Sequence, residues 1–266
     1  MVVDHNIQRR ASALNAAMRR TARSGARLVT LQEVCWWHVR NLREQHPGWS
    51  IAYQPDAHSG RCRTRPDLGS LPDADRDDSG NVVIWTGGDR AGVGARVFRA
   101  QPSRGFRQGM ACLHVRVRIA LDVCSVHLAH AGVRKQLRRV QVRQAREVDR
   151  ATRRWIARGH LVVVGGDFNA APSTRPLDQL YRVNGTGRFV EATGCRPTVD
   201  LCRRTRGVTL DRGRQKIDYV FFSANRTPPG TLHGLSLTHT LSDHHLLTGW
   251  AYVDVRPARR GPGRTA

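Results

Sequence analysis

Lysine is almost absent from this chain. Of the 44 basic residues only Lys135 and Lys216 are lysines, so arginine carries nearly all of the formal net charge of +23. A charge of this sign and size favours an anionic partner, and nucleic acid is the first candidate. Because the arginines are spread along the whole chain, codon composition explains the bias equally well. The sequence leaves both interpretations open.

Long apolar runs are also missing. No stretch approaches the roughly 20 apolar residues that a membrane-spanning helix requires, which favours a soluble protein. The first ten residues, MVVDHNIQRR, lack the apolar core of a secretory signal. No repeat and no linker divides the chain. We therefore expect a single domain over residues 1–255, followed by a basic, disordered tail over residues 256–266.

The six cysteines lack the CxxC spacing of a zinc site. They form three pairs of sequence neighbours: Cys35 with Cys62, Cys112 with Cys124, and Cys195 with Cys202. Three disulfides would indicate an oxidising compartment and favour a secreted protein. Six free thiols in a cytosolic protein is the alternative.

Strand patterns outnumber helix patterns. Apolar runs typical of strands occupy residues 2–7, 26–34, 81–86, 93–98, 109–117, 120–128, 161–166, 216–223, 232–239 and 246–255. Helices are predicted over residues 8–20, 36–45 and 133–158, and the last is expected to pack on the core through Val133, Leu137, Val140, Val148 and Trp155. Residues 54–80 are rich in Pro, Gly, Ser and Asp and predict a long irregular loop. Helices placed between strands favour two packed sheets flanked by helices.

Polar residues recur at the ends of the predicted strands. Eight of them hold corresponding places: Asn6, Glu33, His127, Asp167, Asn169, Asp218, Asp243 and His244. Each alone has an ordinary explanation, such as a helix cap or a turn. Asp218 is the hardest to explain, because a carboxylate within KIDYVFF costs on the order of several kcal/mol unless it is paired. Since α/β proteins place reacting groups at strand ends, the set favours a functional site.

The chemistry of these eight residues is coherent. Carboxylate and carbonyl oxygens suit a hard cation such as Mg²⁺. Two histidines can supply a base and an acid near neutral pH, and an amide can donate hydrogen bonds to developing negative charge. Together they predict hydrolysis of a phosphate ester by activated water.

Six segments, HNIQ, LQEV, SVHLAH, GGDFNA, KIDYVFFS and SDHHLL, occur in an order that resembles the endonuclease/exonuclease/phosphatase superfamily, which has the deoxyribonuclease I-like fold. GDFN and SDHH are the most specific of these segments. The resemblance covers residues 3–254 and implies an α/β (α+β) protein with a catalytic domain. The implied architecture is a four-layer α-β-β-α sandwich of two packed mixed sheets, with the site among the loops between them.

The resemblance implies a metal site with Mg²⁺ as cofactor, Mn²⁺ as a substitute and a structural Ca²⁺ as a further option. Glu33 is the implied principal ligand, and Asn6 and Asp243 complete or support the site. Asp167 is implied to orient water or bind metal. Asn169 is implied to stabilise the transition state.

The resemblance also implies the proton transfers. His244 is the implied general base that activates water, oriented by the buried Asp218. His127 is implied to donate a proton or a hydrogen bond to the phosphate. In some relatives an acidic residue pairs with the counterpart of His127, and Asp78 is the candidate here.

The leading functional prediction is an Mg²⁺-dependent phosphodiesterase or endonuclease acting on nucleic acid, with DNA favoured. Candidate phosphate contacts lie in loops at Arg61, Arg104 and Arg107. A phosphatase or a sphingomyelinase-like phospholipid phosphodiesterase would use the same catalytic residues, because substrate choice depends on the loops. A basic nucleic-acid-binding protein without catalysis is the alternative from another class, and the intact catalytic set disfavours it. No protein partner is implied.

Overall fold

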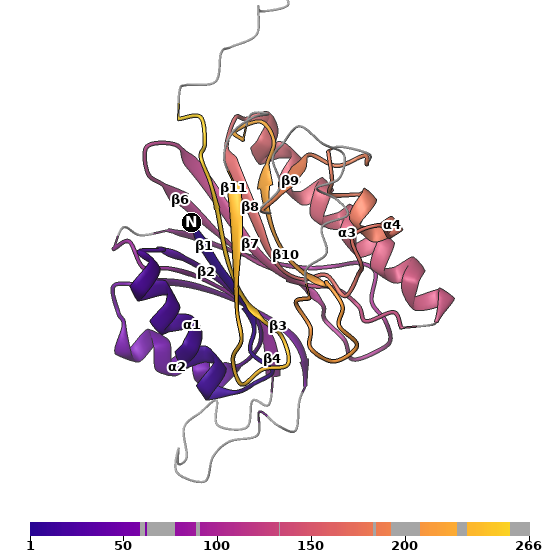
Figure 1. The fold of residues 1–266 in the computed structure, drawn as a ribbon, viewed down its shortest axis with the longest axis horizontal. Helices are drawn as coiled ribbons and strands as arrows, with labels where there is room; N and C mark the ends of the chain where they lie inside the picture. The colour runs from indigo at the N-terminus through magenta and orange to yellow at the C-terminus, as the bar shows by residue number, and fades with distance from the viewer. Residues whose placement is uncertain are drawn as a thin grey trace, which may run out of the picture.

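Two mixed sheets of six strands each pack face to face, and helices cover their outer faces (Figure 1). The computed structural model describes residues 1–58, 62, 78–88, 91–132, 134–182, 185–192, 208–227 and 233–255. Arg61, the Cys195 and Cys202 pair and the predicted tail lie outside these residues. The predicted α-β-β-α sandwich is confirmed.

The first sheet has the strand order β11 (His233–Thr238), β12 (Leu246–Ala251), β1 (Val2–Asn6), β2 (Leu28–Cys35), β4 (Asp78–Trp85) and β3 (Ser50–His58). β1 and β2 are parallel and are connected through α1 (Ala11–Ser24). This helix and α2 (Trp36–Gln45) cover the outer face of the sheet (Figure 1).

The second sheet has the order β5 (Gly92–Val97), β6 (Gly109–Arg116), β7 (Ala120–His127), β8 (Leu161–Asp167), β10 (Asp218–Ser223) and β9 (Phe189–Glu191). β7 and β8 are its parallel pair, and the connection between them contains α3 (Lys135–Ala157). The short helix α4 (Arg175–Asp178) lies with α3 on the outer face (Figure 1).

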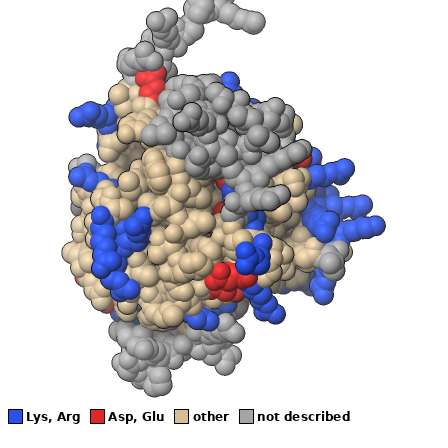
Figure 2. All heavy atoms as spheres, in the orientation of Figure 1, with Lys and Arg blue, Asp and Glu red and all other residues tan. Residues whose placement is uncertain are grey.

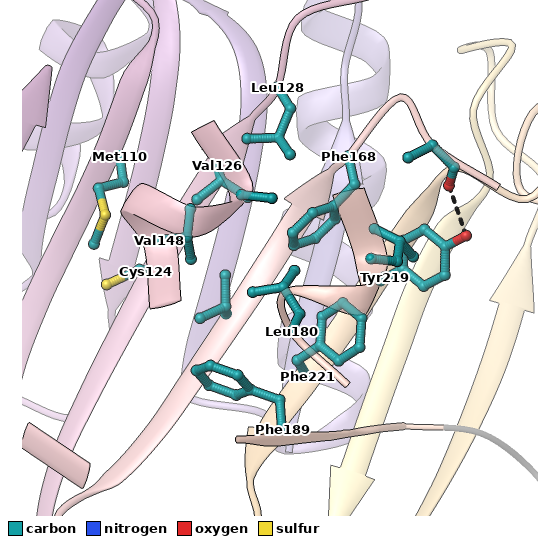
Figure 3. Packing of buried hydrophobic residues seen from close by; sticks show 14 of the residues in the cluster. Met110, Cys124, Val126, Leu128, Val148, Phe168, Leu180, Phe189, Tyr219 and Phe221 are labelled. Atoms are coloured by element: carbon teal, nitrogen blue, oxygen red, sulfur yellow. Dashed lines mark hydrogen bonds between the residues drawn. The ribbon is translucent and has the colours of Figure 1, made fainter. Parts of the chain in front are cut away.

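Apolar clusters fill each of the spaces between layers. Val83, Val163 and Leu247 belong to the cluster between the two sheets. Beneath α3, an aromatic group includes Phe168 and Phe221, whose ring centroids are 5.4 Å apart (Figure 3). Tyr219 joins this group and donates its hydroxyl hydrogen to the Ala170 carbonyl at 2.8 Å. This packing fixes the chain just beyond the end of β8.

Residues 54–80 are not the continuous irregular loop that was predicted. Residues 54–58 complete β3, and residues 78–80 begin β4. β3 is an edge strand, so one of its sides has no neighbouring strand to hydrogen-bond. Proline lacks a backbone N–H, and Pro55 is tolerated here because no partner on that side requires one. The turn-forming composition of the segment therefore gave no sign of the end of β3 or the start of β4.

The inner face of α3 also differs from the predicted apolar stripe. Val148 is buried as expected, but Leu137 and Val140 are only half-buried, and Val133 lies outside the described residues. Polar side chains take most of the buried positions, among them Gln141 and Gln144. These glutamines bond to loop backbone, which removes the cost of burying them.

Two of the three predicted disulfides are present. Cys35 bonds to Cys62, and Cys112 bonds to Cys124 across the β6–β7 pair. Across the parts of the chain that the structure describes, no helix has the length and apolar content needed to cross a membrane.

Candidate active site

Three neighbouring strands of the second sheet place three predicted residues in one row. His127 pairs with Asp167 across β7 and β8, and Asp167 pairs with Asp218 across β8 and β10. Because paired residues share a face of the sheet, the three side chains point to the same side. They face the first sheet, since Asn6 at the end of β1 donates a hydrogen bond to Asp167 Oδ2 at 3.1 Å.

β2 is irregular where it reaches the site. Its pairing with β4 shifts register between Leu31 and Val34, and Glu33 within this shift has a φ of 54°. A positive φ at a non-glycine residue costs roughly 1–3 kcal/mol and is found most often at functional sites. The bulge turns Glu33 toward Asn6, whose Nδ2 lies 3.2 Å from Glu33 Oε1.

Asp167 Oδ2 is the atom on which the site converges. The Nε2 atoms of His127 and His244 lie 3.6 Å and 3.8 Å from it. Asp167 Oδ1 accepts a hydrogen bond from the Asn169 backbone N–H at 2.8 Å. Two imidazoles therefore lie beside one buried carboxylate, which places a candidate acid and a candidate base at the same place in the site.

His244 and Asp218 form the predicted pair. Both carboxylate oxygens of Asp218 lie within 3.0 Å of His244 Nδ1, which leaves Nε2 facing Asp167 and, at 3.7 Å, Asp243 Oδ1. Burial lowers the pKa of His244, but the charges of the surrounding carboxylates outweigh burial and raise that pKa to about 10. Burial raises the pKa of Asp218, and the charge of His244 opposes this rise.

The acidic partner of His127 is Asp56, in place of the predicted Asp78. Asp56 Oδ2 lies 3.5 Å from His127 Nδ1. Asp56 is the extra residue where the β3–β4 register shifts between Pro55 and Ala57, so a bulge directs it into the site. Burial lowers the pKa of His127, but the hydrogen bond to Asp56 and the nearby carboxylates raise it to about 9. Asp78 begins β4 instead.

The donor set fits a hard divalent cation. Glu33, Asp167 and Asp243 offer carboxylate oxygens, and Asp243 Oδ1 is a buried oxygen without a hydrogen-bond partner among the described residues. Glu33 forms an ion pair with Arg9, a residue that sequence reasoning missed. Asn6 turns its Nδ2 toward Glu33 and Asp167, so in this arrangement it orients the ligands rather than offering its oxygen.

Asn169 is tied into the loop after β8. It has a φ of 50°, its Nδ2 donates to the Leu128 carbonyl at 3.0 Å, and its Oδ1 lies 3.0 Å from His130 Nδ1. Gln141 of α3 holds this loop, because its Nε2 lies 2.7 Å from the Asn169 carbonyl oxygen and 3.0 Å from that of Ala129. Sequence reasoning missed Gln141, and its helical position gave no signal.

The arginines predicted to contact phosphate are less closely connected to the catalytic residues than the strand-end residues are. Arg104 and Arg107 are exposed in the connection from β5 to β6. The Arg107 backbone N–H donates to the Asp56 carbonyl at 2.8 Å, so this loop lies beside the Asp56–His127 pair. Among the described residues, the Arg104 side chain makes no hydrogen bond or ion pair with the catalytic residues, and Arg61 lies outside the described part of the chain.

Comparison with solved structures shows the same fold. The chain is similar to truncated TDP2 from Caenorhabditis elegans, with a TM-score of 0.62, 15% identity, and coverage of 94% of this chain and 96% of that one. The chain is also similar to the human nocturnin catalytic domain with bound sulfate, with a TM-score of 0.63, 14% identity, and coverage of 95% of this chain and 94% of that one. For D. rerio TDP2 complexed with a single-strand DNA product, the TM-score is 0.61 and the identity 14%, and the match covers 92% of this chain and 96% of that one.

Comparison with sequences shows the family. A search of curated proteins finds no significant match. The model of the endonuclease/exonuclease/phosphatase family matches residues 5–244. This range includes all eight strand-end residues, from Asn6 to His244. The chain therefore belongs to the endonuclease/exonuclease/phosphatase family.

Proposed function

We propose that this protein is a divalent-metal-dependent phosphodiesterase that cleaves nucleic acid, with DNA as the favoured substrate and Mg²⁺ as the metal. The observation that carries the proposal is the convergence of two imidazole Nε2 atoms on Asp167 Oδ2, beside the Glu33 carboxylate. Acid, base and carboxylate ligands at one place suit the attack of water on a phosphate ester.

In this proposal each residue of the site has a separate role. Glu33 and Asp243 hold the metal, with Asn6 orienting Glu33. A bound divalent cation supplies positive charge that offsets these carboxylates and polarises the phosphate. His244, held by Asp218, accepts a proton from the attacking water at Nε2 in its neutral form, which a divalent cation beside the carboxylates would favour by lowering the pKa that their charges raise. His127, held by Asp56, donates a hydrogen bond or a proton to the phosphate.

The preference for nucleic acid rests on charge and on one relative. Figure 2 shows basic side chains at several places on one face of the molecule, including the edge where α3 lies in Figure 1. A net charge of +23 attracts polyanions. D. rerio TDP2, which has a similar fold, has been solved with a single-strand DNA product.

Nicking of supercoiled plasmid tests the proposal. Purified protein is incubated with the plasmid in Mg²⁺, Mn²⁺ or EDTA, beside a His244→Ala variant that is checked for folding by circular dichroism. We expect nicking in Mg²⁺ that EDTA and the substitution both abolish. A folded protein that never nicks, yet hydrolyses a phosphomonoester or a phospholipid in Mg²⁺, would contradict the nucleic-acid assignment while keeping the catalytic site.

The two disulfides fit an oxidising environment, and we propose that the protein acts outside the reducing cytosol. The number of free thiols in the denatured, non-reduced protein from its native source tests this. Two or fewer reactive thiols are expected. Six would show that the cysteines are reduced and would contradict the proposal.

A further inference from the structure

A second group of metal-binding side chains lies outside the catalytic set. Asp211, His239 and His245 each place one donor atom within 4.8 Å of the donor atoms of the other two. His245 Nε2 lies 2.7 Å from Asp211 Oδ1, and His239 Nδ1 lies 3.8 Å from Asp211 Oδ2. The two imidazole rings have centroids 4.0 Å apart. Ligands from two segments of the chain, Asp211 in one and His239 and His245 in the other, therefore meet at one point.

The spacing of these atoms fits a transition-metal ion. Zn²⁺ binds nitrogen and oxygen at roughly 2.0–2.2 Å, which in a tetrahedral site separates two ligand atoms by roughly 3.4 Å. The separations of 2.7 Å and 3.8 Å from Asp211 lie on either side of this value. Two imidazoles with one carboxylate suit Zn²⁺ and its neighbours, whereas Mg²⁺ prefers oxygen ligands alone.

The cluster combines one anchored ligand with two that face solvent. The side chain of His245 is only 7% exposed, whereas those of Asp211 and His239 are 51% and 76% exposed. His245 Nδ1 has no hydrogen-bond partner within the described chain, so the ring is held by packing and by Asp211. An ion can enter from solvent, bind the three side chains and keep a further position for water.

The cluster lies between the two segments that carry the catalytic pair. The Asp211 backbone N–H donates to the Asp243 carbonyl at 2.8 Å, and the His245 N–H donates to the Thr209 carbonyl at 2.7 Å. Thr209 Oγ1 in turn accepts a hydrogen bond from the Asp218 backbone N–H at 3.0 Å. His245 directly follows His244 in the chain. An ion held by Asp211 and His245 would therefore bridge the segments that position Asp218 and His244.

We propose that Asp211, His239 and His245 form a second metal site, specific for Zn²⁺ or a similar transition-metal ion, that stabilises the loop pair behind the His244–Asp218 contact. The ion replaces the hydrogen bond between Asp211 and His245. It stabilises the folded state because the unfolded chain does not bring the three ligands together.

Zn²⁺ titration of the full-length, metal-free protein in excess Mg²⁺ tests the site, because Mg²⁺ occupies oxygen-ligand sites but not this one. We expect one equivalent of Zn²⁺ by calorimetry, a visible absorption band when Co²⁺ replaces it, and a rise in melting temperature. His239→Asn should weaken Zn²⁺ binding at least tenfold and remove the rise, and its exposed position leaves folding intact. His46→Asn removes a histidine far along the chain and should change neither.

Equal Zn²⁺ affinity in the wild type and in His239→Asn would overturn the proposal, as would complete displacement of Zn²⁺ by Mg²⁺. A second variant, Asp211→Asn, guards against replacement of one ligand by water and should also weaken binding. Mg²⁺-dependent nicking without Zn²⁺ should be unchanged in His239→Asn. Failure of the second metal site is thereby distinguishable from failure of the proposed nuclease activity.

Discussion

Asp218 is buried, and both of its carboxylate oxygens contact His244 Nδ1. An Asp218→Asn variant keeps the shape but removes the charge, and its amide can face the ring with an N–H that favours the wrong tautomer. We expect nicking to slow by about 100- to 10,000-fold, the range attributed to a positioned acid or base. Single-turnover cleavage of plasmid in saturating Mg²⁺ measures the effect. A rate within threefold of wild type would show that Asp218 does not orient the base.

Asp4 provides a pH-dependent prediction away from the reacting atoms. It is fully buried between the sheets, where Thr30 and Gln32 donate to its Oδ1. Burial raises its pKa from 3.8 to about 8, although these two hydrogen bonds oppose the rise. The folded state therefore holds a proton that the unfolded chain has already released. The contribution of Asp4 to stability consequently falls as the pH rises from about 4 to about 8 and is constant above that range.

Asp4→Asn removes this titration while keeping an oxygen for Thr30 and Gln32. Over the same pH window, we expect the free energy of unfolding of the wild type to fall relative to the variant, by on the order of a few kcal/mol. Urea unfolding of both proteins at several pH values is the measurement. Parallel curves for the two proteins would mean that Asp4 is already ionised in the folded state.

The site residues that lie at strand ends could be predicted from the sequence. The strand predicted over residues 161–166 ends one residue before the end of β8 at Asp167, and the polar residues at the ends of such strands come together as expected. Asp56 was missed because its position depends on a bulge in an edge strand, which no local pattern announces. Arg9 was missed because its ion pair with Glu33 joins two segments whose approach only the folded structure shows.

At the scale of the element, β8 is a strand that needs glycine. A Cβ atom at Gly165 would lie 2.2 Å from Thr30 Oγ1 and 3.0 Å from Asp4 Oδ1, both of which belong to the opposite sheet. Gly165→Ala therefore forces the two sheets apart or displaces a buried polar pair. We expect a loss of about 1–3 kcal/mol in the free energy of unfolding.

Gly48→Ala is the matched control, because no atom lies within 4 Å of the Cβ position there. Urea unfolding of both variants and the wild type should show a lower midpoint for Gly165→Ala alone. Equal midpoints for the two variants would indicate that the sheets can separate locally at no cost, contrary to the close packing seen at this strand.

The position of α3 could be predicted from the sequence, but the function of its buried polar side chains could not. Its bounds are close to the predicted range, since periodicity reports which residues are helical. The buried Gln141 and Gln144 are explained only by the loop carbonyls and amides that they satisfy. Those partners come from segments that precede or follow the helix, so a local apolar pattern has no information about them.

At the scale of the whole molecule, the net charge of +23 has two explanations, a selected affinity for nucleic acid or an arginine-rich composition. Counterion release separates them. Neutralisation of about five phosphates predicts a slope of roughly −4.5 for log K against log salt, which is a loss of about 500-fold in DNA affinity between 50 and 200 mM salt. Fluorescence anisotropy with labelled DNA, in EDTA to prevent cleavage, measures the slope.

The salt dependence of catalysis then decides whether this charge serves the active site. A small phosphodiester such as bis-p-nitrophenyl phosphate has no extended backbone, so its Mg²⁺-dependent hydrolysis should change little over a salt range that strongly weakens DNA cleavage. If both substrates respond alike, the arginines do not guide a polymer to the site. If DNA cleavage alone falls, in parallel with binding, the charge acts by capturing DNA, while the row of His127, Asp167 and Asp218 acts on the phosphate that reaches it.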